Sequence, residues 1–327
     1  MKMVSGEHSE IFHYTNGAGL AGIVSSGTLR TTHIEFLNDH EEYRLFFRAI
    51  LPRMIRSSVE RAYEAVRTHP FVTHDVRRAG GERAYKQKKF DELLPVFAHW
   101  TREFNAPYVA SFCVPETRLV AEHGLLSQWR AYGPDGGYAM VFDTARFEKL
   151  LFEEGTQIRG MVLFMGDVEY YDDPALDDGQ YPETRKNRET VVSNIAKFLA
   201  SGESNDLAPI FVPIHQMGCT TKHWGFREER EVRLVLSQPH PSLVEALPDE
   251  HVLKTVHHVL KNGAAVPYMA LFDKLSCPVQ GRLPLKRVLI GPHAENSNRK
   301  LATELLLRNY GYTDVPVTVS SIPYRGR

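Results

Sequence analysis

Short β-rich runs and amphipathic helical stretches follow one another along this chain without strict alternation, and this order limits the fold more than any other feature. We expect a strand at residues 11–15, a helix at residues 17–26 that ends at Gly27, and a second strand at residues 28–32. A doubly wound sheet would need regular alternation of strands and helices, so the pattern predicts an α+β fold. Further strands are expected at 108–114, 138–143, 161–170, 229–236, 268–272, 287–290 and 315–320, and further helices at 184–201, 207–221, 250–261 and 296–310.

Residues 39–105 are predicted to form a helical insertion within a single α+β domain that spans residues 1–327. Apolar side chains recur at helical spacing over residues 43–54, and a second helix is expected around residues 93–100. The glycine pair at 80–81 is typical of a loop between them. Apolar stripes on so few helices need a partner surface, so we expect the insertion to form a lid or a wall against the core.

The net charge, the first residues and the cysteines limit which partners and which cellular location we expect. The formal net charge is -1, which provides no general electrostatic attraction to nucleic acids or membranes, although local basic patches are compatible with it. The first residues lack an apolar signal region, and no run approaches the roughly 18 apolar residues of a spanning helix. We therefore expect a cytoplasmic protein without a membrane partner. The three cysteines are far apart, which favours buried thiols over disulfides or structural zinc.

The segment 226–235, Phe-Arg-Glu-Glu-Arg-Glu-Val-Arg-Leu-Val, carries charges into an apolar strand. With a two-residue period, Glu229, Glu231 and Arg233 point to one side of the predicted strand. Two neighbouring carboxylates repel each other, which raises a pKa unless a cation such as Arg233 offsets it. An ionised carboxylate could stabilise a cationic transition state such as an oxocarbenium ion at a ribose C1. The alternative is an exposed, charged edge strand.

Two other segments could contribute to a site. His13, followed by Tyr14 and Thr15, stands at the end of a predicted strand, where it could contact a ligand or be an ordinary core or surface histidine. Residues 33–42 contain the residue types of a divalent-metal site, but Asn38 and its neighbours also cap the following helix. Capping is the favoured interpretation, and no metal is expected.

The segment 127–133, Ser-Gln-Trp-Arg-Ala-Tyr-Gly, places Trp129 and Tyr132 one helical turn apart. Such spacing is more typical of core packing than of a ligand wall, although Ser127 and Gln128 keep the second interpretation open. The chain has no G-x-S-x-G, P-loop or G-x-G-x-x-G motif, so the commonest hydrolase, kinase and dinucleotide-binding folds have no motif support.

Several short motifs follow one another along nearly the full chain. They are Phe-His-Tyr-Thr at 12–15, Gly-Thr-Leu-Arg-Thr-Thr at 27–32, Leu-Asn-Asp at 37–39 with Glu42, Ala-Ser-Phe at 110–112, the segments 127–133 and 226–233, and Ser-Ile-Pro-Tyr-Arg at 321–325. In this order they resemble the DUF2971 family of bacterial proteins, with a more distant resemblance to ADP-ribosyltransferases. The strand, short helix and G-x-L opening is similar to that of DarT-type enzymes.

The resemblance implies an ADP-ribosyltransferase-like mixed or antiparallel β core with a helical insertion. It implies that Glu231 is the catalytic glutamate and that Glu229 meets the acceptor; which glutamate does which rests on position only. The long insertion departs from a minimal transferase, and no tyrosine of an H-Y-E set can be assigned. The NAD-binding residues that we expect are His13, Tyr14, Thr15, Thr31, Asn38, Ser111, Ser127, Gln128, Trp129, Tyr132 and Arg233.

The expected function is NAD-dependent mono-ADP-ribosylation of a macromolecular acceptor, protein or nucleic acid, in a toxin or phage-defence setting. NAD would be the substrate. The alternatives are an NAD glycohydrolase and a non-catalytic module that binds a nucleotide or a partner.

Overall fold

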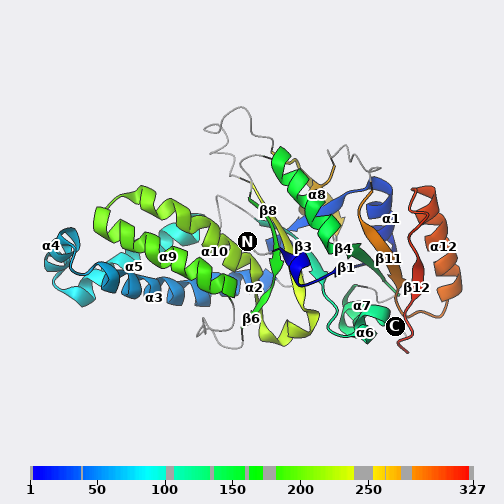
Figure 1. Ribbon diagram of the computed structural model, residues 1–327, viewed down its shortest axis with the longest axis horizontal. Helices are drawn as coiled ribbons and strands as arrows, with labels where there is room; N and C mark the ends of the chain where they lie inside the picture. Colours follow the sequence, from blue (N-terminus) through cyan, green and yellow to red (C-terminus); the bar gives the residue numbers. More distant parts are fainter. Residues whose placement is uncertain are drawn as a thin grey trace.

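A largely antiparallel sheet of ten strands, counted over the residues that the structure describes, occupies the centre of the computed structural model (Figure 1). The structure describes residues 3–37, 40–100, 107–132, 136–158, 162–171, 182–238, 253–261, 263–273 and 282–323. The main path runs β12-β11-β4-β1-β3-β2-β10-β9, and β8 and β5 continue from β3. The ten strands are β1 (Glu10–Thr15), β2 (Leu29–His33), β3 (Pro107–Cys113), β4 (Tyr138–Asp143), β5 (Val162–Asp167), β8 (Glu231–Ser237), β9 (Val256–Lys261), β10 (Ala264–Leu271), β11 (Leu285–Ile290) and β12 (Val317–Val319).

The mixed helix and strand class is confirmed. Only β11 and β12 pair in parallel within the described part of this sheet. A second, two-stranded sheet joins β6 (Glu169–Tyr171) and β7 (Thr221–His223) in parallel. The segment expected as one strand at 161–170 is therefore two strands, β5 and β6, which belong to different sheets.

The helix expected at 250–261 is wrong over its described part, because Val256–Lys261 is strand β9. Val256, Val259 and Leu260 have the i, i+3, i+4 spacing of a helix, which explains the prediction. Six registered pairs with the neighbouring strand β10 instead hold the segment extended. Tertiary pairing thus overrides a local periodicity.

The sheet divides at strand β3. All seven residues of β3 pair with β8 along one edge. The opposite edge is shared, because Cys113 pairs with Phe12 of β1 while Tyr108 and Val109 pair with His33 and Thr32 of β2. Strands β1 and β2 therefore separate along β3, and the described residues include no strand partner for residues 110–112 on this edge. This separation forms a gap in the sheet.

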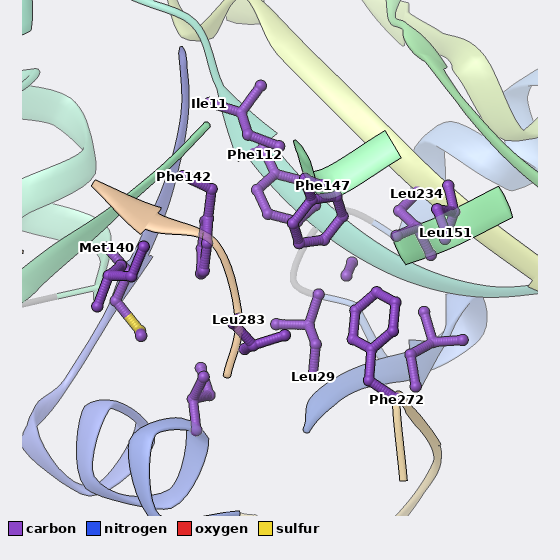
Figure 2. Close-up of a cluster of buried hydrophobic side chains, with 14 of the residues drawn as sticks. Ile11, Leu29, Phe112, Met140, Phe142, Phe147, Leu151, Leu234, Phe272 and Leu283 are labelled. Atoms are coloured by element: carbon purple, nitrogen blue, oxygen red, sulfur yellow. The ribbon is translucent and has the colours of Figure 1, made fainter. Parts of the chain in front are cut away.

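One face of the sheet is covered by three helices. They are α1 (Gly17–Ser26), α8 (Thr144–Gln157) and α12 (Asn296–Asn309). Figure 2 shows side chains from this core, in which Phe112 and Phe142 of the sheet meet Phe147 of α8. The packed apolar side chains fix the position of β3, the strand at which the sheet divides.

The opposite face is covered in two separate places. A bundle of helices packs over β5 and the far end of β8, and it extends away from the sheet (Figure 1). Helix α7 (Leu126–Tyr132) covers β1 and β4, with α6 (Arg118–His123) preceding it. The part of this face that lies between the bundle and helix α7 carries the polar side chains of the candidate functional site. The bundle contains α2 (His40–Leu45), a π-helical turn (Phe46–Ile50), α3 (Leu51–Val66), α4 (Pro70–Ala79), α5 (Glu82–His99), α9 (Pro182–Ser201), a 3₁₀ helix (Ser204–Ile210) and α10 (Phe211–Thr220).

The helices of the 39–105 segment pack against partners that come from a distant part of the sequence. Helix α3 lies along α9, and α4 and α5 complete the same apolar cluster. Helix α10 contacts both β5 and β8. The segment thus forms one half of a bundle whose other half follows strand β6, and α10 joins this bundle to the sheet.

Candidate functional site

The charged segment 226–235 does not form one continuous strand. Residues Trp224–Glu229 form a 3₁₀ helix, and Arg230 has a φ of 42°, in the left-handed region. A non-glycine residue in this region interrupts extended backbone. Strand β8 therefore begins at Glu231, and the expectation that Glu229, Glu231 and Arg233 share one face of a strand is wrong for Glu229.

Glu229 and Glu231 nevertheless form ion pairs with the same buried lysine, Lys222, which the sequence did not indicate. Lys222 Nζ lies 2.9 Å from Glu229 Oε2 and 3.1 Å from Glu231 Oε2. The Lys222 side chain is 2% exposed and Glu231 is 3% exposed, so these charges are almost fully removed from water. Lys222 belongs to the three-residue strand β7, too short to show a periodic signal in the sequence.

Glu231 also forms a two-point ion pair with Arg233 on the same side of β8. Arg233 Nε donates to Glu231 Oε1 at 2.8 Å, and Nη2 donates to Oε2 at 3.2 Å. A third guanidinium hydrogen bond, from Nη1 to the Cys219 carbonyl at 2.9 Å, ties this pair to helix α10. The two-residue period correctly placed these two side chains together.

The carboxyl group of Glu231 is held in its ionised form. Burial alone would raise its pKa, but the charges of Arg233 and Lys222, with hydrogen bonds from Arg233 and Ser111, lower the pKa to about 2. Ser111 is paired with Arg233 across β3 and β8, which places its hydroxyl on the same side of the sheet. The site therefore presents a carboxylate at any physiological pH.

His13 lies at the gap between β1 and β2. Its Nδ1 is 3.0 Å from the carbonyl oxygen of Ser111, on the part of β3 that lacks a described strand partner along that edge. Because a carbonyl only accepts, Nδ1 carries the proton. Burial lowers the pKa of His13, partly offset by this hydrogen bond. The ring is therefore neutral at pH 7, and its Nε2 is an acceptor.

These side chains line a cavity of about 170 Å³ between the separating strands. Among the residues expected from the sequence, it gathers His13, Tyr14, Ser111, Gln128, Tyr132, Glu229, Glu231 and Arg233. Its wall also includes residues that sequence reasoning missed, which are Lys222, Arg30, Thr32 and Lys261 among others. The strand alternation could have indicated Arg30 and Thr32, which lie on the other side of β2 from Thr31.

Trp129 and Tyr14 have packing roles. Trp129 is 1% exposed and donates from Nε1 to the carbonyl of His123. The Tyr14 ring meets it edge-on with centroids 4.9 Å apart, and the Tyr14 hydroxyl accepts from the amide of Leu125. Tyr14 thus lines the cavity, but its ring and hydroxyl are held in place by their contacts with Trp129 and Leu125.

Three more of the expected residues are not among those that line the cavity. Thr31 is fully buried on the opposite side of β2, where its hydroxyl donates to the Met269 carbonyl. Thr15 ends strand β1 opposite Tyr138, and Ser127 is in α7; neither is among the lining residues. Asn38 lies outside the described residues.

A second cavity, of about 880 Å³, also reaches Glu231, and the charged residues in its lining are mostly acidic. At this cavity Glu7, His8 and Asp167 place one donor atom each within 4.8 Å of one another. His8 Nε2 is 2.8 Å from Asp167 Oδ1. Two carboxylates and an imidazole could hold a divalent cation, but all three are also ordinary surface ionic partners. The expectation of no metal stays a prediction.

Comparison with known proteins supports the family resemblance. Residues 128–234 match the family described as "Protein of unknown function (DUF2971)". This range begins in helix α7 and includes Lys222, Glu229, Glu231 and Arg233. No curated protein and no solved structure matches the chain. None of the helices in the described ranges combines the length and apolar character needed to cross a membrane.

Proposed function

We propose that this protein is an NAD-dependent mono-ADP-ribosyltransferase that acts on a macromolecular acceptor. The observation that carries the proposal is the buried, ionised carboxylate of Glu231 in the wall of a cavity where two strands separate. A preorganised anion in a site shielded from water stabilises developing positive charge far better than a solvated one. Loss of nicotinamide from NAD develops such a charge on the ribose.

In the proposed reaction the bond between ribose C1 and the nicotinamide nitrogen breaks, and nicotinamide leaves with the electron pair. Glu231 stabilises the resulting oxocarbenium ion, which a nucleophile of the acceptor then attacks at C1. His13, neutral and fixed by the Ser111 carbonyl, offers Nε2 as an acceptor for a ribose hydroxyl. Positioning of this kind lowers the barrier by removing rotational freedom before the chemical step.

The two carboxylates and two cations of the site have complementary roles. Glu231 already accepts hydrogen bonds from Arg233, Lys222 and Ser111, so a ribose hydroxyl must displace one donor. Lys222 is the donor with a second carboxylate partner, Glu229, at 2.9 Å. Lys222 can therefore move away from Glu231 without becoming an unpaired buried charge. Glu229 also offsets a positive charge that would oppose a cationic transition state.

The test is nicotinamide release from NAD, with labelled ADP-ribose followed into macromolecules of a cell lysate. Glu231→Gln keeps the side-chain shape but removes the charge, and we expect it to lower the rate by ~10²-fold or more. Glu228→Gln is the matched control, because Glu228 is an exposed carboxylate of the same segment. Equal rates for the wild type and Glu231→Gln would contradict the assigned role.

Three outcomes separate the proposed activity from its alternatives. Label on a macromolecule supports the transferase. Label that remains entirely as free ADP-ribose indicates an NAD glycohydrolase that uses the same site. No nicotinamide release from the wild type would indicate a binding module and would overturn the proposal.

A further inference from the structure

The cavity at Glu231 carries more positive than negative charge. Its lining contains four basic residues, Arg30, Lys222, Arg233 and Lys261, but only two acidic ones, Glu229 and Glu231. Lys222 and Arg233 are neutralised by these two carboxylates. Neither Arg30 nor Lys261 forms an ion pair with another residue in the described ranges. The lining therefore leaves two positive charges for a bound anion.

Arg30 belongs to an aromatic surface that continues from the cavity across the sheet. Its guanidinium lies over the ring of Tyr268, 4.7 Å from the centroid. Tyr268 stacks with His257 of β9 at a centroid distance of 5.4 Å. Tyr268 is paired with Thr32 on one side and with His257 on the other. Cross-strand partners in an antiparallel sheet point to the same face, so this surface and the Thr32 side of the cavity are continuous.

The pairing of β2, β3 and β8 extends this surface to Glu231. Thr32 pairs with Val109 of β3, and Ser111, two residues further, pairs with Arg233 of β8. All of these side chains therefore lie on one face of the sheet. A ligand can extend from Glu231 past the gap between β1 and β2 to Tyr268 and His257 without crossing the sheet.

We propose that Arg30 and Lys261 bind the diphosphate group of a nucleotide whose base lies against Tyr268 and His257. The inference rests on the proposed function, in which the reacting ribose lies beside Glu231. The charge and the size of the cavity both favour such a ligand. A diphosphate diester carries two negative charges, which match the two cations that lack a described carboxylate partner. The cavity of about 170 Å³ is smaller than the roughly 300 Å³ at which ligand pockets begin, so most of a dinucleotide must lie on the adjoining surface.

Arginine and aromatic rings suit this task for separate reasons. A guanidinium binds phosphate oxygens in two-point geometry, and Arg30 is already oriented by its contact with Tyr268. A nucleobase gains from stacking on an aromatic side chain, whichever base it is. The surface thus selects a ligand that has phosphate and base together, and nicotinamide riboside, which lacks phosphate, does not use it.

The test is calorimetric binding of ADP-ribose, which resembles the donor without its leaving group. We expect Arg30→Gln and Lys261→Gln each to weaken ADP-ribose binding at least ~10-fold, because each removes a hydrogen bond to a charged group. Both side chains are exposed, so the fold should be unaffected. Arg78→Gln, an exposed cation of α4 remote from the sheet, is the matched control and should bind as the wild type does.

Two further ligands separate the parts of the site. Tyr268→Ala should weaken binding of ADP-ribose more than that of inorganic pyrophosphate, because both ligands lose the contact that orients Arg30 but only ADP-ribose has a base. Nicotinamide riboside should bind the wild type, Arg30→Gln and Lys261→Gln equally. Wild-type affinity for ADP-ribose in both charge variants, or no ADP-ribose binding to the wild type at millimolar concentration, would overturn the inference.

Failure of this inference is distinguishable from failure of the proposed function. Binding that depends on Arg30 and Lys261, without nicotinamide release by the wild type, would retain the nucleotide site and reject the transferase. Nicotinamide release that depends on Glu231, with ADP-ribose affinity unchanged in both charge variants, would retain the transferase and reject this site.

Discussion

The ionised state of Glu231 makes folding stability dependent on pH in a defined window. The ordinary pKa of 4.5 falls to about 2 in the folded protein. At about 1.4 kcal/mol per pKa unit, the ionised group contributes ~3 kcal/mol of stability at neutral pH. Because the folded pKa is the lower one, this contribution is complete above pH 4.5 and is lost as the pH falls towards 2. Between pH 6 and pH 3.5 we expect a loss of ~1 to 2 kcal/mol.

The assay compares wild type and Glu231→Gln by urea unfolding at a series of pH values, with tryptophan fluorescence, to which the buried Trp129 contributes, as the signal. Glutamine does not titrate, and other titrating groups act in both proteins, so the difference between their free energies of unfolding isolates Glu231.

We expect the advantage of the wild type over Glu231→Gln to shrink as the pH falls from 6 to 3.5. A difference that stays constant over this range would show that Glu231 has no lowered pKa in the folded protein. The main physical support for an oxocarbenium-stabilising carboxylate would then be lost.

Two further predictions concern groups outside the cavity. Burial lowers the pKa of His215 from 6.5 to about 4, so the unfolded chain takes up the extra proton and stability falls by ~3 kcal/mol as the pH drops from 6.5 towards 4. His215→Gln should remove this slope in urea unfolding, and an unchanged slope would contradict the assignment. Gly124→Ala should lower stability by ~2 to 4 kcal/mol, since φ is 77° and a Cβ would lie 2.5 Å from Trp129. Gly22→Ala is its control, because Gly22 is exposed in a helix and a Cβ added there would have no atom within 4 Å. We expect this variant to raise the melting temperature slightly.

Elements with strong local signals were predictable from the sequence. Helix α1 and strand β4 have the expected bounds, because Gly27 ends the helix in a left-handed conformation and the glycine pair at 136–137 sets the turn before the strand. Strand β9 was not predictable, since its apolar spacing favoured a helix until pairing with β10 held it extended. Local chemistry decides where an element ends, and neighbours decide what an ambiguous segment becomes.

The candidate site likewise combines features that the local sequence specifies with features that depend on the tertiary structure. The pairing of Glu231 with Arg233 follows from the two-residue period of a strand, which is a property of the sequence alone. The break at Arg230 was not visible, because an arginine with positive φ depends on the structure around it. Which expected residues would reach one cavity was also beyond the sequence, as Thr31 and Trp129 show by facing into packed cores.

The sequence by itself determined the mixed helix and strand class, the charged strand and the pairing of Glu231 with Arg233, because these depend on periodicity and residue type. Only the tertiary structure decided that Lys222 lies between Glu229 and Glu231, and that β1 and β2 separate along β3. The reason is physical: buried charges and strand pairings are set by partners far away in the chain, whose positions no local pattern specifies. The ionisation of Glu231 follows from those partners rather than from its own sequence neighbours alone.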